Sequence, residues 1–310
     1  MEMKAPLFAL GVVGYLLQQP VLARNVDPVK LPPVNLGGGF FAEGLARPGH
    51  HLMFQQNFYS VENIKDGYGE ETPGEKNNRI STSIFQYALN TSQKVFGAEY
   101  GFTVRLPVIH SDIDVEGGAR GRDAGVGDIT LRPVKLTWRD MPLGSGRLTL
   151  QSILALTLPT GAYDAGQQVN VGSNYLYLNP MFAGTYFSGR WSHSFNLGYV
   201  WSERNDDPVG GRARSVQPGA AMNLSLSSGY LVSERLRLGL AGYGLEQLRD
   251  DRIDGRRVGR SKESVSALGP AFSYFHRQAR LGFGVAWYEE FDARNRGQGT
   301  RVIANIHKGF

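Results

Sequence analysis

The sequence predicts an all-β fold, a transmembrane antiparallel β-barrel of about 12 strands of the outer-membrane type. Three observations predict it. The 310 residues include 40 Gly, 14 Tyr, 16 Phe and 4 Trp, a composition that favours strands and turns over helices. Runs of roughly 10 to 15 residues alternate between apolar and polar side chains, as strands with two different environments do. Long and short connections alternate between these runs, which is typical of outer-membrane barrels.

Composition and charge exclude several classes of protein. With 41% hydrophobic and 20% charged residues, the chain is expected to fold rather than to be disordered. The absence of Cys excludes a disulfide framework, a zinc–thiolate site, a thiol nucleophile and a lipidated N-terminal cysteine. The net charge of +5 is interleaved with acidic residues, so no nucleic-acid groove is expected.

Residues 1–23 have the organisation of a secretory signal peptide. Lys4 precedes the 13-residue, mostly apolar run 5–17, and Pro20 and Ala23 follow. Thirteen apolar residues are too few to span a bilayer. We therefore expect export and cleavage after Ala23, the alternative being a buried N-terminal helix. An exported chain without a transmembrane helix would enter a membrane as a barrel.

Residues 24–48 are rich in Pro and then in Gly, and predict no regular element. They form either a disordered periplasmic segment or a plug that enters the barrel, with Leu36, Phe40 and Phe41 as side chains to bury. The run Gly37–Gly39 lacks the strand-to-helix context of a phosphate-binding loop.

Residues 49–310 form the predicted barrel, with both chain termini on the periplasmic side. Its strands are expected near residues 50–61, 80–91, 95–110, 126–138, 147–158, 175–187, 191–202, 219–231, 236–248, 264–275, 279–289 and 299–310. Six long loops and five short turns connect them in strict alternation, and the last long loop covers residues 290–298.

The alternation of side chains assigns residues to the lumen or to lipid. Residues 191–202 show it most clearly, with Phe195 and Leu197 opposite Ser194 and Asn196. A charge on the lipid face would cost roughly 2–4 kcal/mol at mid-depth, so charged strand residues are expected inside. The predicted solute path is lined by Glu99, Arg105, Arg132, Lys135, Gln151 and Asn196.

This lumen set permits two interpretations. Paired charges would fill or hydrate a narrow lumen, whereas a charged constriction would select solutes by size and sign. The excess of Arg and Lys would then favour anionic or π-rich solutes. Small inward residues favour an open path; they are Gly198, Gly282, Gly284, Ser225 and Ser227.

Aromatic residues at strand ends predict the two membrane girdles. Trp138 and Trp191 lie beside short turns, and Trp201 and Trp287 lie beside long loops. The chain ends on an amphipathic strand whose last residue is Phe310. A terminal Phe is typical of the signal that the barrel-assembly machinery recognises.

Several motifs resemble those of one known family. Residues 125–138 resemble its GxGDxxxxPxxLxW signature, and residues 158–164 resemble its LPTGxYD element. The run Leu268-Gly269-Pro270 matches a further element. On these residues the chain resembles the family called MetA-pathway of phenol degradation, in its branch of SphA-like outer-membrane proteins. The resemblance implies a Gram-negative outer-membrane location and uptake of hydrophobic or aromatic compounds.

The same motifs also have a structural interpretation. Gly127 allows a tight backbone, Asp128 can accept hydrogen bonds from local backbone donors, and Pro133 in mid-strand predicts a bulge. Simple barrel architecture or a shaped constriction would both account for the motif residues, which are Gly127, Asp128, Pro133, Pro159, Gly161, Gly269 and Pro270.

The sequence therefore predicts a channel for passive uptake of small hydrophobic or aromatic compounds, without a cofactor or metal. The alternative is a non-conducting barrel that binds lipid or a surface partner. Lipopolysaccharide is an expected partner because loop 249–264 is basic, although its charges can also pair among themselves. No enzyme is expected: no HExxH or GxSxG motif occurs, and His193 cannot serve Ser192 or Ser194 as a base from the opposite strand face.

Overall fold

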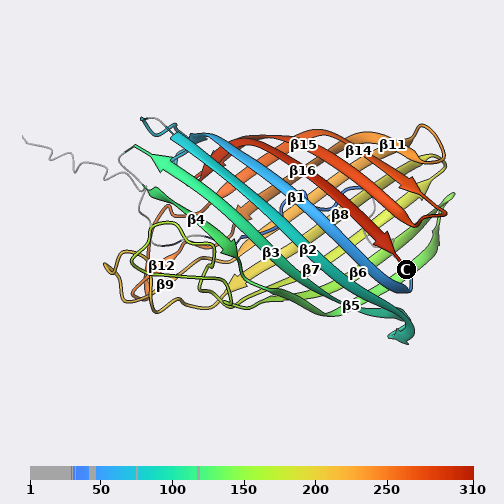
Figure 1. The fold of residues 1–310 in the computed structure, drawn as a ribbon, viewed down its shortest axis with the longest axis horizontal. Helices are drawn as coiled ribbons and strands as arrows, with labels where there is room; N and C mark the ends of the chain where they lie inside the picture. The colour runs from blue at the N-terminus through green and yellow to red at the C-terminus, as the bar shows by residue number, and fades with distance from the viewer. Residues whose placement is uncertain (1–28, 30, 32, 42–46, 75, 117–118) are drawn as a thin grey trace, which may run out of the picture.

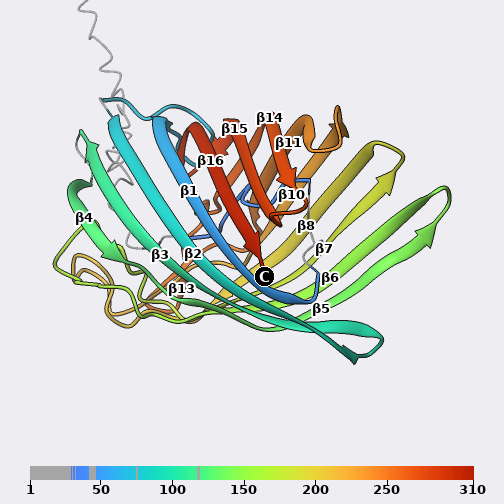
Figure 2. The same ribbon diagram turned by 45° about the vertical axis from the view of Figure 1, so that its right-hand side comes forward.

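A computed structural model shows that the strands close into an antiparallel β-barrel (Figures 1 and 2). The structure describes residues 29, 31, 33–41, 47–74, 76–116 and 119–310, so the predicted signal peptide lies outside them. These residues contain strands, turns and loops but no helix. Across the described residues, no helix capable of crossing a bilayer was found.

Twelve strands form the barrel, as the sequence predicted. They are β1 (Gly49–Ile64), β2 (Lys76–Val95), β3 (Ala98–Val115), β5 (Thr130–Leu143), β6 (Gly146–Thr157), β7 (Tyr177–Ser188), β8 (Trp191–Ser202), β10 (Ala221–Leu231), β11 (Leu236–Gln247), β14 (Ser264–His276), β15 (Leu281–Arg294) and β16 (Gly297–Gly309). Each pairs with its neighbour in the sheet, and β1 pairs with β16, which closes the ring. Closure removes the unpaired strand edges that a bilayer could not satisfy.

Four short strands lie outside this ring. β4 (Arg120–Val126) pairs with the distal part of β3, and a small sheet consists of β9 (Val216–Gln217), β12 (Arg252–Ile253) and β13 (Arg256–Arg257). Figure 1 shows them at the end of the barrel opposite the C-terminus. The long loops therefore gather at one end and the short turns at the other, as in outer-membrane barrels.

One predicted connection is wrong. Residues 290–298 were expected to form a long loop, but β15 runs to Arg294 and β16 begins at Gly297. Asp292 and Asn295 adopt positive φ angles of 52°, a conformation that short polar side chains tolerate. The sequence predicted a loop because the residues after Trp287 are polar. In the structure these polar residues extend the β15–β16 hairpin beyond the apolar band. Five long connections remain instead of six.

Burial follows the predicted period of two. On β6, Thr149, Gln151 and Ile153 are buried, while Leu154 is exposed. Large apolar side chains point outward over many strands, among them Phe58, Phe85, Leu197, Leu226, Leu240 and Trp287. A contiguous exposed apolar surface of this kind is expected of a barrel surrounded by lipid.

Trp138, Trp191, Trp201 and Phe310 lie toward the ends of the barrel, whereas Trp287, expected beside a long loop, lies midway along β15. The Trp138 indole donates a hydrogen bond to the Phe96 carbonyl in the β2–β3 turn (3.2 Å), and Trp191 packs edge-on against Tyr230 near two other short turns. Trp191, Trp201, Trp287 and Phe310 are all among the exposed apolar residues. The Phe310 amide donates to the His50 carbonyl (2.9 Å), which places the C-terminus beside the start of β1.

Candidate functional site in the barrel lumen

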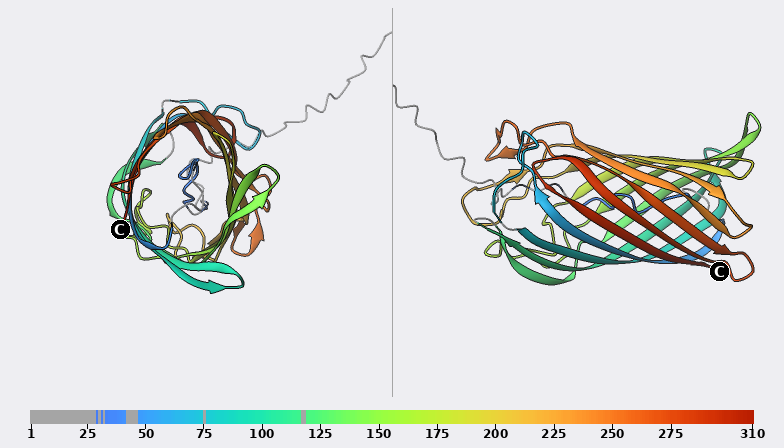
Figure 3. Two further views of the ribbon diagram at one scale, coloured as in Figure 1. Left: turned by 90° about the vertical axis from the view of Figure 1, so that its right-hand side faces the viewer. Right: turned by 90° about the horizontal axis from the view of Figure 1, so that it is seen from above.

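The N-terminal segment, by which we mean the described residues 29, 31 and 33–41, lies inside the barrel. Viewed along the barrel axis, it runs through the ring of strands (Figure 3, left). Leu36, Phe40 and Phe41 are at most 6% exposed and belong to one apolar cluster with residues of β7, β8, β10, β11, β14, β15 and β16. No residue of β2, β3, β5 or β6 belongs to that cluster as the described residues define it. The segment thus covers one side of the lumen.

The segment runs along the barrel axis from the long-loop end toward the short turns. The Leu31 amide donates to the Glu263 carboxylate (3.3 Å) at the long-loop end. Phe40 and Phe41 lie deeper, next to Gly284 and Gly229 near the short turns. The described segment therefore extends to the end opposite the C-terminus. The predicted periplasmic position of the N-terminus falls on residues that lie outside the described ones.

Small residues make room for the segment instead of leaving an open path. A Cβ atom added to Gly284 would lie 2.9 Å from the Phe40 ring, and one added to Gly229 would lie 2.8 Å from the Phe41 ring. The Ser227 hydroxyl accepts a hydrogen bond from the Phe41 amide (2.8 Å). Phe41 has a φ of 61°, which is strained for a bulky residue. Its surroundings therefore determine its conformation.

Tyrosines of the wall hold the segment at Gly37 and Pro33. The Tyr288 hydroxyl donates to the Gly37 carbonyl (2.9 Å), and the Tyr177 hydroxyl donates to the Pro33 carbonyl (2.9 Å). Gly37 has a φ of 68°, and an added Cβ would lie 2.9 Å from both Tyr243 and Tyr288. Only glycine fits this combination of backbone conformation and close approach.

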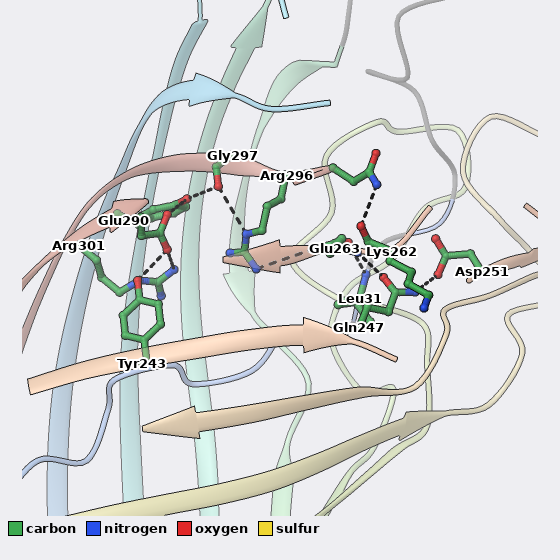
Figure 4. Close-up of polar contacts among 12 residues, drawn as sticks. Leu31, Tyr243, Gln247, Asp251, Lys262, Glu263, Glu290, Arg296, Gly297 and Arg301 are labelled. Carbon is green, nitrogen blue, oxygen red and sulfur yellow. Dashed lines mark hydrogen bonds and ion pairs between the residues drawn. The ribbon is translucent and has the colours of Figure 1, made fainter. Parts of the chain in front are cut away.

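A buried ion pair lies beside these tyrosines (Figure 4). The Glu290 carboxylate accepts hydrogen bonds from the hydroxyls of Tyr59 (2.6 Å) and Tyr243 (2.7 Å) and pairs with Arg301 (3.6 Å). The Arg301 guanidinium also lies 4.4 Å from the centre of the Tyr59 ring. We call Tyr59, Tyr243, Glu290 and Arg301 the Glu290 cluster. Its charges are compensated within the wall.

A second polar chain continues toward the loops in Figure 4. Glu263 pairs with Arg296 (3.9 Å), and its amide donates to the Gln247 side chain (2.8 Å). The Gln247 amide group donates in turn to Asp251, which accepts from the Gly219 amide (2.8 Å). These contacts join the loops after β8 and β11 to the wall that carries the segment.

The Glu290 cluster is absent from the lumen residues that the sequence predicts. Its signal was present in part, because Arg301 lies on the strand face opposite Val302 and therefore points inward. Glu290 was assigned to the loop 290–298 that the structure replaces by strand. The aromatic partners Tyr59 and Tyr243 come from β1 and β11, whose proximity no local pattern contains.

All six predicted lumen residues are on inward-facing strand positions. Glu99 pairs with Arg139 (2.9 Å), Arg105 donates to Gln86 (2.5 Å), and Gln151 donates to Thr137 (2.9 Å). Arg132 lies opposite Thr103, whose side chain is buried, and Asn196 lies opposite the buried Ala183. Lys135 is 7% exposed and lies opposite Gly101.

Apart from Glu99, these residues divide into a basic group, to which Arg139 also belongs, and a neutral group. Arg105, Arg132, Lys135 and Arg139 come from β3 and β5, whereas Gln151 and Asn196 come from β6 and β8. Glu99 is the one carboxylate of stretches 98–105 and 130–139. The basic strip, as we call Arg105, Arg132, Lys135 and Arg139, faces the lumen on the side that the apolar cluster leaves uncovered.

The family-motif residues form a junction at the loop end. The Asp128 carboxylate accepts hydrogen bonds from the Gly161 amide (2.9 Å) and from the amide (2.8 Å) and hydroxyl (2.5 Å) of Ser173. Its partners are therefore distant in sequence, not local as expected. Gly127 donates to the Pro107 carbonyl (2.9 Å), and an added Cβ on Gly161 would lie 2.9 Å from the Gly127 backbone. The junction joins β5 to the loop between β6 and β7.

The remaining motif residues shape strands. The pairing of β5 with β6 shifts register between Leu131 and Val134, which is the bulge predicted at Pro133. Pro159 follows the end of β6, and Pro270 is on the outward face of β14. A Cβ atom on Gly269 would overlap the Trp287 carbonyl of β15, so this glycine permits close strand approach.

The basic loop 249–264 pairs its charges in part. Arg257 forms an ion pair with Asp250 (2.5 Å), and the Arg260 guanidinium lies 4.8 Å from the centre of the Tyr68 ring. Tyr68 belongs to the acidic loop after β1. The two loops thus contact each other across the loop end of the barrel.

Comparison with known proteins gives one family and several solved barrels. The family model described as MetA-pathway of phenol degradation matches residues 62–306. The COG4313 outer membrane channel from Pseudomonas putida F1 is 17% identical, with 91% of this chain and 100% of that chain covered and a TM-score of 0.76. The transport unit of the autotransporter AIDA-I from Escherichia coli is 9% identical, with 93% and 95% covered and a TM-score of 0.53. No curated protein sequence matches the chain.

Proposed function

The chain belongs to the MetA-pathway of phenol degradation family, and on that premise we propose that it is an outer-membrane channel for passive uptake of small hydrophobic or aromatic compounds. The fold is that of an outer-membrane barrel, which it shares with a channel from Pseudomonas putida F1. The proposal includes export by the N-terminal signal peptide into a Gram-negative outer membrane. It includes no catalytic step and no cofactor.

The observation that carries the proposal is the unequal covering of the lumen. The N-terminal segment packs against the wall from β7 to β16. The opposite wall, from β3 to β6, presents the basic strip together with hydroxyl and amide groups such as Thr137 and Gln151. Polar groups beside an apolar segment suit solutes that combine a hydrophobic ring with a polar substituent.

In this proposal the N-terminal segment is a plug that narrows the path. Its contacts with Glu263, Tyr177, Tyr288 and Ser227 span the barrel from the loop end toward the short turns. Removing residues 24–47 should widen the path without opening the ring, because β1 still pairs with β16. The loss of Leu36, Phe40 and Phe41 would uncover the apolar wall residues against which they pack.

Single-channel conductance of the refolded mature chain in planar bilayers tests the proposal. We expect small conductance steps from the intact chain and larger steps after deletion of residues 24–47. Gly229→Val should also enlarge the steps, because its side chain would collide with Phe41 as well as with the Arg237 side chain. Gly244→Ala is the matched control on β11, where the added Cβ meets Val265 O at an ordinary 3.9 Å.

Uptake of a labelled hydroxylated aromatic compound into vesicles containing lipopolysaccharide provides the second measurement. Intact and deleted chains should both accelerate uptake over empty vesicles. If neither folded form conducts ions or accelerates uptake, the channel proposal is wrong. The alternative, a non-conducting barrel that binds lipid or a surface partner, would then account for the filled wall.

A further inference from the structure

The side chains of Phe40 and Phe41 fill a place on the barrel wall that fits aromatic rings. Their ring centres lie 5.6 Å apart with the ring planes at 90°, and both side chains are buried. An added Cβ on Gly229 would lie 2.8 Å from Phe41 Cδ1 and 2.7 Å from Arg237 Cδ. We call this place the ring seat and define it by the wall residues Ser227, Gly229, Arg237 and Gly284.

The segment that carries these rings is attached to the wall without strand pairing. Among the described residues 29, 31 and 33–41, no backbone-to-backbone hydrogen bond joins the segment to a strand. The Phe41 amide donates instead to the Ser227 hydroxyl (2.8 Å). Phe41 also has a φ of 61°, a strained conformation that persists only where the surroundings impose it. A small molecule with the same ring and the same donor, but without the strained backbone, would compete with Phe41 for the seat.

The donor and the ring of Phe41 define the ligand that the seat accepts. In a phenylalanine residue two saturated carbon atoms, Cα and Cβ, separate the amide nitrogen from the ring. Ser227 accepts from that nitrogen, and the ring lies against Gly229. An aromatic alcohol whose hydroxyl is two carbons from the ring reproduces this spacing, whereas a phenol carries its hydroxyl on the ring itself. Such a ligand also keeps the buried Ser227 hydroxyl hydrogen-bonded.

We propose that the ring seat binds small aromatic compounds with a hydrogen-bond donor two saturated carbons from the ring, and that these compounds displace Phe41. The proposal rests on the proposed channel function and names the class of solute that the channel takes. The solute hydroxyl donates to Ser227, and the solute ring replaces the Phe41 ring. The N-terminal segment is then an internal competitor that occupies the site when no solute is bound.

Equilibrium dialysis of labelled 2-phenylethanol against the refolded mature chain measures this site without requiring transport. Deletion of residues 24–47 removes the competitor, so it should strengthen binding about tenfold or more. In the deleted chain, Gly229→Val should abolish binding because its side chain would occupy the seat. Gly244→Ala in the same chain is the control, since its added Cβ meets the Val265 carbonyl oxygen at 3.9 Å. Gel mobility on heating verifies folding, and Gly229→Ala replaces Gly229→Val if the latter does not fold.

Ser227→Ala tests the recognition of the hydroxyl. In the deleted chain it should weaken binding of 2-phenylethanol about three- to tenfold, in keeping with the loss of one hydrogen bond. Binding of propylbenzene, which has a methyl group in place of the hydroxyl, should not change. Ser111→Ala is the matched control, because Ser111 is a buried serine of β3, on the wall that the apolar cluster leaves uncovered. If Ser227→Ala affects the two compounds equally, the proposal is overturned.

Hydrogen exchange followed by mass spectrometry measures the displacement of Phe41 in the intact chain. Saturating 2-phenylethanol should accelerate exchange of the Phe41 amide, because Ser227 then accepts from the solute instead. Unchanged exchange at saturation would overturn the proposal, and so would equal affinity of the intact and the deleted chain for 2-phenylethanol.

The two proposals can fail separately. Binding of 2-phenylethanol that depends on Gly229 and Ser227, without conduction or uptake, would support the ring seat and contradict the channel. Uptake of aromatic compounds by a chain that binds no 2-phenylethanol, with or without residues 24–47, would support the channel and contradict the ring seat.

Discussion

At the scale of single residues, the cationic side chains of the lumen wall have two different kinds of surroundings. Arg301 is enclosed by Glu290, Tyr59 and Tyr243, so its charge contributes to the wall itself. Lys135 belongs to the basic strip and lies opposite Gly101 of β3. A compensated pair such as that of Arg301 stabilises a fixed structure.

The Glu290 cluster leads to a stability prediction. Glu290→Ala would leave Arg301 buried without its carboxylate, which typically costs about 3–5 kcal/mol. Glu290→Gln keeps an acceptor for the tyrosine hydroxyls and should cost less. Urea unfolding of the refolded barrel, followed by tryptophan fluorescence, measures both.

Glu62→Gln is the control for this series, because Glu62 is exposed near the end of β1. Surface substitutions of this kind usually change stability by within about 0.5 kcal/mol. A Glu290→Ala variant as stable as the Glu62→Gln variant would show that the cluster does not support the wall.

At the scale of elements, the regular spacing of strands and turns gives no information about long-range contacts. Asp128 was predicted to bond its own turn, but it holds Gly161 and Ser173 of the next loop. The bulge at Pro133 was predicted because proline lacks the amide that a strand ladder needs. A missing donor is a local property, whereas the partner of a carboxylate depends on which loop the fold brings near.

The Asp128 junction leads to a prediction about the loop after β6. Asp128→Ala removes three hydrogen bonds that hold residues 158–176. The loop should then open more often and be cut faster by chymotrypsin at Tyr163, while the barrel remains folded. Limited proteolysis with mass spectrometry measures the rate.

Asp206→Ala is the matched control, since its ion pair with Arg204 is exposed and lies in a different loop. If the two variants are cut at Tyr163 at the same rate, the Asp128 hydrogen bonds do not restrain the loop.

At the scale of the whole molecule, closure of the ring and insertion into a membrane are separate requirements. β1 and β16 pair along most of their length, so closure does not depend on the last side chain. Phe310 is 59% exposed at the end of β16. A side chain that contributes little to packing is available for recognition by another protein.

Phe310→Ala should therefore lower the amount of protein in the outer membrane of cells without impairing refolding into lipid vesicles. Membrane fractionation measures the first quantity, and gel mobility after heating measures the second. Phe283→Ala, which removes another outward aromatic side chain near the start of β15, is the control. Equal membrane levels of the two variants would contradict recognition through Phe310.

The sequence by itself determined the strands, their faces and the inward placement of residues such as Arg105 and Lys135. These properties follow from a period of two and from the cost of placing charge in lipid, both of which are local. It also offered Leu36, Phe40 and Phe41 as the side chains that residues 24–48 would bury if they formed a plug and not a disordered segment.

Only the tertiary structure decided which of these residues meet. Phe41 contacts Ser227 and Gly229, which lie almost two hundred residues later in the sequence. Glu290 accepts a hydrogen bond from Tyr59, which comes from the other end of the chain. Ring closure creates these contacts by bringing distant strands together around a common axis. Period and composition describe each strand separately, so they contain no information about partners across the lumen.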